Sequence, residues 1–207
     1  MLVQYNAADK VINKPKSDHS TDVNYFELSD LERIRECLKK EPFKWHTIAH
    51  LLIVTGCRRG EIAGLKWNAV DLDKGVLHIY NNLLYSQEIG VYQDTPKTTT
   101  SDRYINLPEE TVQLLREYKA YWNNFRISCG SEWHSFINIK DSKGIEHSER
   151  ADFLFVQDSG ANVGYPMHPD SITDYFKKFS KKYDLPHINP HAFRHTLASV
   201  LCQSGVD

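Results

Sequence analysis

Hydrophobic residues recur at helical spacing along much of the chain, and several of these runs start at a recognisable signal. Ser29 and Glu32 form an S-x-x-E capping box, and Pro108 and Pro169 suit the first turn of a helix. Segment 45–55 is apolar almost all round toward its end, which predicts a central, buried helix. The pattern as a whole predicts helices over residues 29–40, 45–55, 59–66, 108–122, 169–183 and 190–205.

The middle of the chain has the pattern of β-strands. Residues 76–80 are rich in β-forming residues and 104–107 alternate polar and apolar side chains, with a polar loop expected over 96–102. A further short strand is expected at 153–156. Segment 123–152 has no clean period, which indicates an irregular insertion.

The order of these elements indicates one α+β domain over residues 25–207, mostly helical, with a small antiparallel β-sheet or hairpin. Residues 1–24 are polar and lack a sustained apolar period, so we expect a linker or arm there. The length of 207 residues and the hydrophobic content of 41% fit one ordinary globular domain.

Composition and charge narrow the classes of function. No stretch approaches the roughly 18 consecutive apolar residues of a membrane span, and the N-terminus lacks the apolar run of a signal peptide. The four cysteines show no CxxC spacing, which indicates free thiols, and we expect a cytoplasmic protein with no membrane partner. The net charge of −2 excludes a simple polycation, so nucleic-acid binding would depend on local placement of charge.

Charged residues occur where the short helix should face the core. Arg58, Glu61, Ile62 and Leu65 are spaced to share one helical face, and the two apolar residues mark that face as packed. A charge at the rim of such a face needs a partner or an anionic ligand, so either a structural Arg–Glu pair or an anion site explains the pattern. Arg59 falls off this face and is expected to be solvated.

Two further stretches place basic residues unusually. Asn189 caps the final helix, so His191 and Arg194 fall in its first turn, where free backbone N–H groups and the positive end of the helix dipole favour an anion. A capping or packing role is the simpler explanation for His191 taken alone. Lys97 lies in the hydroxyl-rich stretch 95–103 and could reach a phosphate, although a solvated hairpin lysine would look the same.

Together these stretches resemble the tyrosine recombinases, also called the phage-integrase or lambda-integrase family. The TGxRxxEhxxLxWxDh block of the family is matched by TGCRRGEI at residues 55–62 and then by Leu65, Trp67 and Asp71, with a longer spacing before the aspartate. The T-K-T-x-x-S-x-R-like stretch of the family is similar to residues 97–103, and HAFRHTLAS at residues 191–199 matches its HxxRHTxAS block. The resemblance covers about residues 25–207.

The resemblance implies site-specific DNA recombination, in which a tyrosine attacks the scissile phosphate and forms a 3′-phosphotyrosyl intermediate. It implies that Arg58 and Arg194 clamp the phosphate oxygens, that Lys97 protonates the leaving 5′-oxygen, and that His191 assists proton transfer. It implies no metal and no cofactor. The implied catalytic residues are Arg58, Lys97, His191 and Arg194, supported by Glu61, which orients Arg58, and by His195.

The family places another histidine or tryptophan and then the nucleophilic tyrosine beyond this last block. Here no tyrosine follows Arg194, and the last one is Tyr183, in a helix where it is expected to pack. We therefore expect a C-terminally incomplete catalytic domain that binds DNA and does not cleave it, with residues 1–24 as the linker from a missing core-binding domain. The implied partners are double-stranded DNA and other recombinase protomers in a tetrameric synapse.

Other functions fit parts of the sequence. A non-catalytic DNA-binding or assembly module would use the basic ridge of the helix at 169–183, although a solvated face explains that ridge equally well. A metal hydrolase could use His191 and His195, but the H-E-x-x-H glutamate is missing. A type IB topoisomerase has a related site. The expected DNA contacts are Lys177, Lys178, Lys181 and Lys182 of the ridge, together with Arg103.

Overall fold

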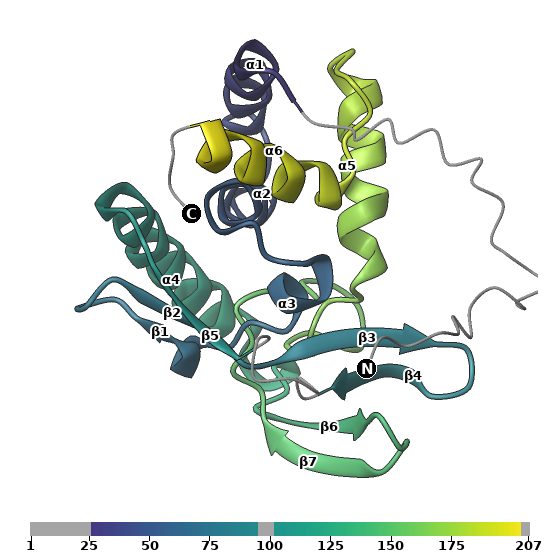
Figure 1. Ribbon diagram of the computed structural model, residues 1–207. Coiled ribbons are helices and arrows are strands. Elements are labelled where there is room, and N and C mark those ends of the chain that lie inside the picture. The colour runs from purple at the N-terminus through teal and green to yellow at the C-terminus, as the bar shows by residue number, and fades with distance from the viewer. Residues whose placement is uncertain (1–25, 95–101, 204–207) are drawn as a thin grey trace, which may run out of the picture.

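The computed structural model describes residues 26–94 and 102–203, so the expected linker at 1–24 and Lys97 lie outside the described residues. Helix α2 is the centre of the helical part and contacts four other helices (Figure 1). Residues from Thr47 to Leu52 supply most of its buried side chains, as the apolar sequence predicts. The helices are α1 (Leu28–Leu38), α2 (Phe43–Thr55), α3 (Arg59–Ala63), α4 (Glu109–Cys129), α5 (Asp170–Lys182) and α6 (Pro190–Gln203).

Two small sheets lie below the helices in Figure 1. One is antiparallel, with the order β1-β2-β5, and the other has the order β3-β4-β6-β7 with a parallel pair between β4 and β6. The α+β class with a small antiparallel sheet is confirmed, and the structure adds a second sheet, which is mixed. The strands are β1 (Val70–Asp71), β2 (Val76–Ile79), β3 (Asn82–Ser86), β4 (Gly90–Asp94), β5 (Arg103–Asn106), β6 (Phe136–Asp141) and β7 (Glu146–Arg150).

The prediction of an irregular insertion over 123–152 is wrong. Helix α4 continues to Cys129, and strands β6 and β7 form an antiparallel hairpin that joins the second sheet beside β4. Ile137 and Ile139 are buried and alternate with exposed Phe136, which is the two-residue period of a half-buried strand. The alternation spans too few residues to stand out among the charged residues around it.

Several boundaries also differ from the expectation. Helix α1 begins at Leu28 with no side-chain cap, so Ser29 lies inside the helix and forms no capping box. The chain before it is instead held by a tertiary contact, because the backbone N–H of Phe26 donates to Thr196 Oγ1 at 2.9 Å. Helix α3 ends at Ala63, and residues 153–156 make isolated bridges instead of a strand, with all four side chains buried.

The apolar stripes of the two long outer helices were predicted correctly. Val112, Leu115, Tyr118 and Trp122 of α4 are buried, and so are Ile172, Phe176 and Phe179 of α5. Within the described residues, no helix combines the length and the apolar content needed to cross a membrane.

Candidate active site

The turn between α2 and α3 is built to bring two distant arginines together. Helix α2 ends at Gly56, whose φ of 58° lies in the left-handed region. A Cβ at this position would lie 3.0 Å from Leu197 Cδ2, so α6 packs directly on the turn. Arg194 of α6 donates from Nη1 to the carbonyl oxygen of Gly56 at 2.8 Å, two residues before Arg58. The Arg194 guanidinium therefore lies at the turn that leads into Arg58, although 136 positions separate the two arginines in the sequence.

Glu61 is the buried anion under this turn. Its side chain is 5% exposed and accepts hydrogen bonds from Arg58 Nη1 at 3.0 Å and from the Arg58 backbone N–H at 2.8 Å. Arg103 of β5 adds two more, from Nη1 at 3.1 Å and from Nη2 at 2.8 Å. Burial by itself would raise the pKa of Glu61, but the hydrogen bonds from Arg103 and Arg58 outweigh it and hold the pKa below its ordinary value. Glu61 is therefore a carboxylate that fixes two guanidinium groups.

The expected pair between Arg58 and Glu61 is present, but the helical-face argument behind it is wrong in detail. Arg58 precedes α3 with an extended backbone, and Leu65 lies beyond the end of the helix. The side chain of Arg58 is still 51% exposed, so the ion pair does not bury it.

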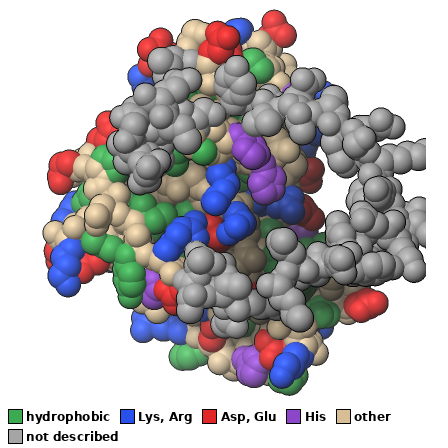
Figure 2. Space-filling model, viewed as in Figure 1, with side chains coloured by type: hydrophobic (Ala, Val, Ile, Leu, Met, Phe, Trp, Pro, Cys, Tyr) green, Lys and Arg blue, Asp and Glu red, His purple; other side chains and the backbone are tan. Residues whose placement is uncertain are grey.

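The first turn of α6 places a histidine beside these arginines. Asn189 caps the helix as predicted, because its Oδ1 accepts the backbone N–H of His191 at 3.1 Å. Partial burial lowers the pKa of His191, and the positive charges of Arg59, His195, Arg194 and Arg58 lower it further. Figure 2 shows basic side chains and histidines gathered near the middle of one face. Basic groups from α3 and α6 thus surround one imidazole.

A pocket of about 230 Å³ lies against this cluster and is lined by Arg58, Arg59 and His191 together with Tyr85 and Asp170. The expectation of a solvated Arg59 is wrong, because its guanidinium has partners within the protein.

The Arg59 guanidinium binds Asp170 Oδ1 at 2.7 Å and Thr173 Oγ1 at 3.0 Å, both on α5. The spacing along α3 carries no information about α5, so the sequence held no signal for this contact.

Arg103 and Lys182, both expected to contact DNA, have partners within the protein. Arg103 turns inward to Glu61, and Lys182 Nζ lies 2.6 Å from Glu41 Oε1. Tyr183, expected to pack, also donates to Glu41 Oε1, at 2.8 Å. Lys177, Lys178 and Lys181 are exposed.

His195 is exposed on α6 and lies close enough to His191 for its charge to act on it. Within residues 26–94 and 102–203, no group of three or more His, Cys, Asp or Glu side chains is placed to hold a metal ion.

All residues of this site lie in a segment that matches a known protein family. A model described as "Phage integrase family" matches residues 24–207, which include every residue of the cluster. The chain belongs to the phage integrase family. This membership confirms the family and the α+β fold inferred from the sequence motifs.

The relatives of this family member include enzymes of mobile elements and tyrosine recombinases. The chain is 29% identical over 163 residues to "Transposase from transposon Tn916" of Enterococcus faecalis, which covers 76% of this chain and 35% of that protein. It is 24% identical over 200 residues to "Tyrosine recombinase XerC-like" of Caldanaerobacter subterraneus, covering 93% of this chain and 46% of that protein. The chain thus spans between about a third and a half of these curated relatives.

Solved structures agree with this placement. The Tn1549 transposon integrase in complex with transposon right end DNA is 25% identical, with a TM-score of 0.71, and the match covers 99% of this chain and 59% of that one. The XerA recombinase is 23% identical with a TM-score of 0.58, covering 88% of this chain and 52% of that one, and shows the fold alone.

Proposed function

We propose that this chain is the part of a site-specific DNA recombinase that binds and activates the scissile phosphate. One observation supports the proposal above all: Arg194 Nη1 donates to the carbonyl oxygen of Gly56, two residues before Arg58, and the charges of both arginines act on His191. Double-stranded DNA is the proposed substrate. The Tn1549 integrase, a structural relative, was solved in complex with DNA.

The two arginines suit a phosphate better in the transition state than in the ground state. A phosphorane carries more negative charge on its equatorial oxygens than the starting diester, and planar guanidinium forks bind such oxygens in pairs. Arg58 and Arg194 would therefore stabilise the transition state selectively. The inward pair of Arg103 and Glu61 would keep Arg58 in position, because Glu61 binds both guanidinium groups.

His191 and Lys97 are the proposed proton-transfer groups. The lowered pKa of His191 favours the neutral imidazole, which can accept a proton from an attacking hydroxyl. Lys97 is assigned by its place in the family motif, and its ammonium would protonate the leaving 5′-oxygen.

We further propose that the 207-residue chain binds DNA but forms no covalent adduct, because none of its tyrosines follows Arg194. The test is incubation with a nicked duplex followed by denaturing electrophoresis, and we expect no protein–DNA adduct. An adduct would contradict the proposal, and peptide mapping would then show whether Tyr85, which lines the same pocket, carries the DNA.

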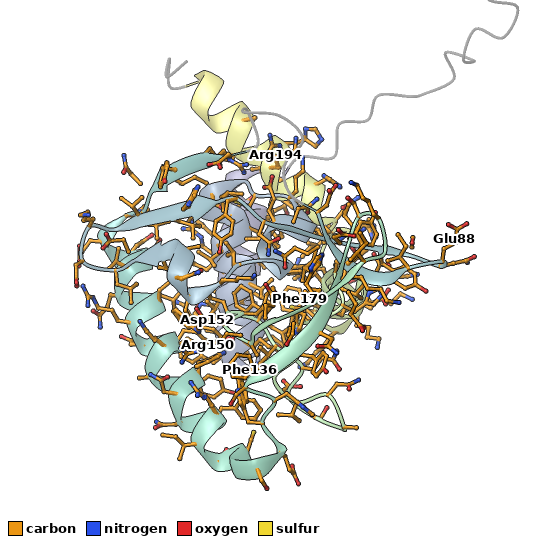
Figure 3. All side chains as sticks on the ribbon, turned by 90° about the horizontal axis from the view of Figure 1, so that it is seen from below. Glu88, Phe136, Arg150, Asp152, Phe179 and Arg194 are labelled. Atoms are coloured by element: carbon orange, nitrogen blue, oxygen red, sulfur yellow. The ribbon has the colours of Figure 1, made fainter. Side chains whose placement is uncertain are left out.

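The phosphate contacts themselves are tested by the salt dependence of binding. Each phosphate contact contributes about 0.9 to the slope of log K against log salt concentration for duplex DNA. Replacing Arg58 and Arg194 by alanine should reduce the slope by about twice that amount. Arg150→Ala is the matched control, because Arg150 lies on the β6–β7 hairpin, away from Arg194 on α6 (Figures 1 and 3). An equal reduction in the control and in the double variant would refute the assignment.

A further inference from the structure

Arg59 differs from its neighbour Arg58 in what it contacts. Its guanidinium reaches the start of α5, where it binds Asp170 Oδ1 at 2.7 Å and Thr173 Oγ1 at 3.0 Å. The Arg59 side chain is 38% exposed and that of Asp170 44%, so water reaches the pair without surrounding it. Two acceptors on one helix hold the guanidinium in a single place.

Asp170 is itself held in place. Its backbone N–H donates to His168 Nδ1 at 3.1 Å, and its second oxygen, Oδ2, lies 3.9 Å from the same nitrogen. The ring of Tyr85 packs against His168 with the centroids 4.6 Å apart. The carboxylate therefore has a defined position on the wall of the 230 Å³ pocket that Arg59 and His191 also line.

Charged groups from three helices lie near His191, and Arg58, Arg59 and Asp170 line the pocket with it. Helix α3 and the residue before it supply Arg59 and Arg58, α6 supplies Arg194 and His195, and α5 supplies Asp170. Strand β3 adds Tyr85 to the pocket wall. Asp170 is the single anion in this set of described residues, and it is bound to Arg59.

We propose that Arg59 is a positioning residue whose charge, held in place by Asp170, keeps the His191 imidazole neutral, so that it can accept a proton at the reacting phosphate. This inference rests on the proposed function, in which His191 accepts a proton at the reacting phosphate. A cation near the imidazole disfavours its protonated form, and an entering phosphate has the opposite effect.

The electrostatic surroundings of His191 support this role. Partial burial is the largest cause that lowers the pKa of His191, and among the neighbouring charges Arg59 comes first, ahead of His195, Arg194 and Arg58. Arg58 and Arg194 are expected to be neutralised by the bound phosphate. Arg59 remains paired with Asp170, so it acts on the free protein and on the complex alike.

The experiment is a pH titration of the His191 ring protons by NMR in the 207-residue chain, with the resonance assigned by its loss in His191→Asn. We expect Arg59→Gln to raise the pKa of His191 and Asp170→Asn to lower it, because the first removes a cation and the second leaves that cation unpaired. Arg59→Lys, which keeps the charge, should stay near the parent chain. A merely structural ion pair predicts shifts in the same direction for both neutral variants, since each breaks the same contact.

An unchanged His191 titration in Arg59→Gln would overturn the proposal, and so would shifts of the same sign in Arg59→Gln and Asp170→Asn. Thr173→Val removes one hydrogen bond and leaves the charges in place, so it should titrate like the parent chain, and a shift as large as that of Arg59→Gln would also overturn the proposal. The titration needs no DNA. A chain that binds no DNA would therefore refute the proposed function while leaving the effect of Arg59 on His191 measurable.

Discussion

Replacement of Glu61 by glutamine tests how the arginine cluster is held together. The Glu61 side chain is 5% exposed and accepts four hydrogen bonds from Arg58 and Arg103, at 2.8 to 3.1 Å. Glutamine keeps one oxygen and presents an amide NH₂ where the second oxygen was, so a donor faces a guanidinium. The change also leaves two positive groups beside a buried neutral side chain.

The expected loss of stability follows from this geometry. Removing one partner of a buried ion pair costs about 3–5 kcal/mol. The side chains of Arg58 and Arg103 are 51% and 27% exposed, and water therefore compensates part of the loss. We expect the lower end, about 3 kcal/mol, which corresponds to a decrease in Tm of about 6–12 °C for a chain of this length.

The pH dependence provides a second measurement on the same variant. Because the pKa of Glu61 is lower in the folded chain, its contribution to stability is complete above the ordinary value of 4.5 and disappears as the pH falls through the folded value. The difference in free energy of unfolding between the parent chain and Glu61→Gln should therefore be largest near neutral pH and decrease in acid.

The assay is urea unfolding followed by circular dichroism at several pH values. Glu36→Gln is the matched control, because Glu36 pairs with Lys39 on the exposed face of α1 with side chains 69% and 62% exposed. Such a surface pair contributes at most about 1 kcal/mol. The reasoning fails if Glu61→Gln loses no more stability than Glu36→Gln, or if its loss does not depend on pH.

Three further predictions concern the turn, a thiol and the basic ridge. Gly56→Ala should lower the free energy of unfolding in urea more than Gly90→Ala does. Both glycines have positive φ, but a Cβ at Gly56 would lie 3.0 Å from Leu197 of α6, whereas a Cβ at Gly90 would meet open space. Equal losses in the two variants would contradict this prediction. Burial raises the pKa of the Cys57 thiol to about 11, so alkylation of Cys57 at pH 8 should be at least ~10-fold slower in the native chain than in urea. Equal rates of Cys57 alkylation would show that the thiol is accessible in the native chain. Charge reversal of Lys177 and Lys178 should reduce the salt dependence of DNA binding, and an unchanged slope would show a solvated face.

Local sequence patterns were enough to identify the family and to predict most of the helices. The stripes of α4 and α5, the glycine that ends α2 and the cap of α6 depend on neighbours within about one helical turn, and periodicity reports such neighbours directly. The spaced motifs around Arg58 and Arg194 identified the family, because each residue type is required at a fixed interval.

Other features depend on partners that are remote in the sequence. Arg103 binds Glu61 across 42 positions, and Arg59 reaches Thr173 across 114, so no local pattern distinguishes these arginines from solvated ones. The hairpin of β6 and β7 owes its place to its parallel contact with β4.

By itself, the sequence determined which segments form helices and which family the chain belongs to, since both depend on residue spacing. Only the tertiary structure decided which partner each basic side chain binds. An ion pair forms where packing brings two side chains within a few ångströms, and that distance depends on every element between them.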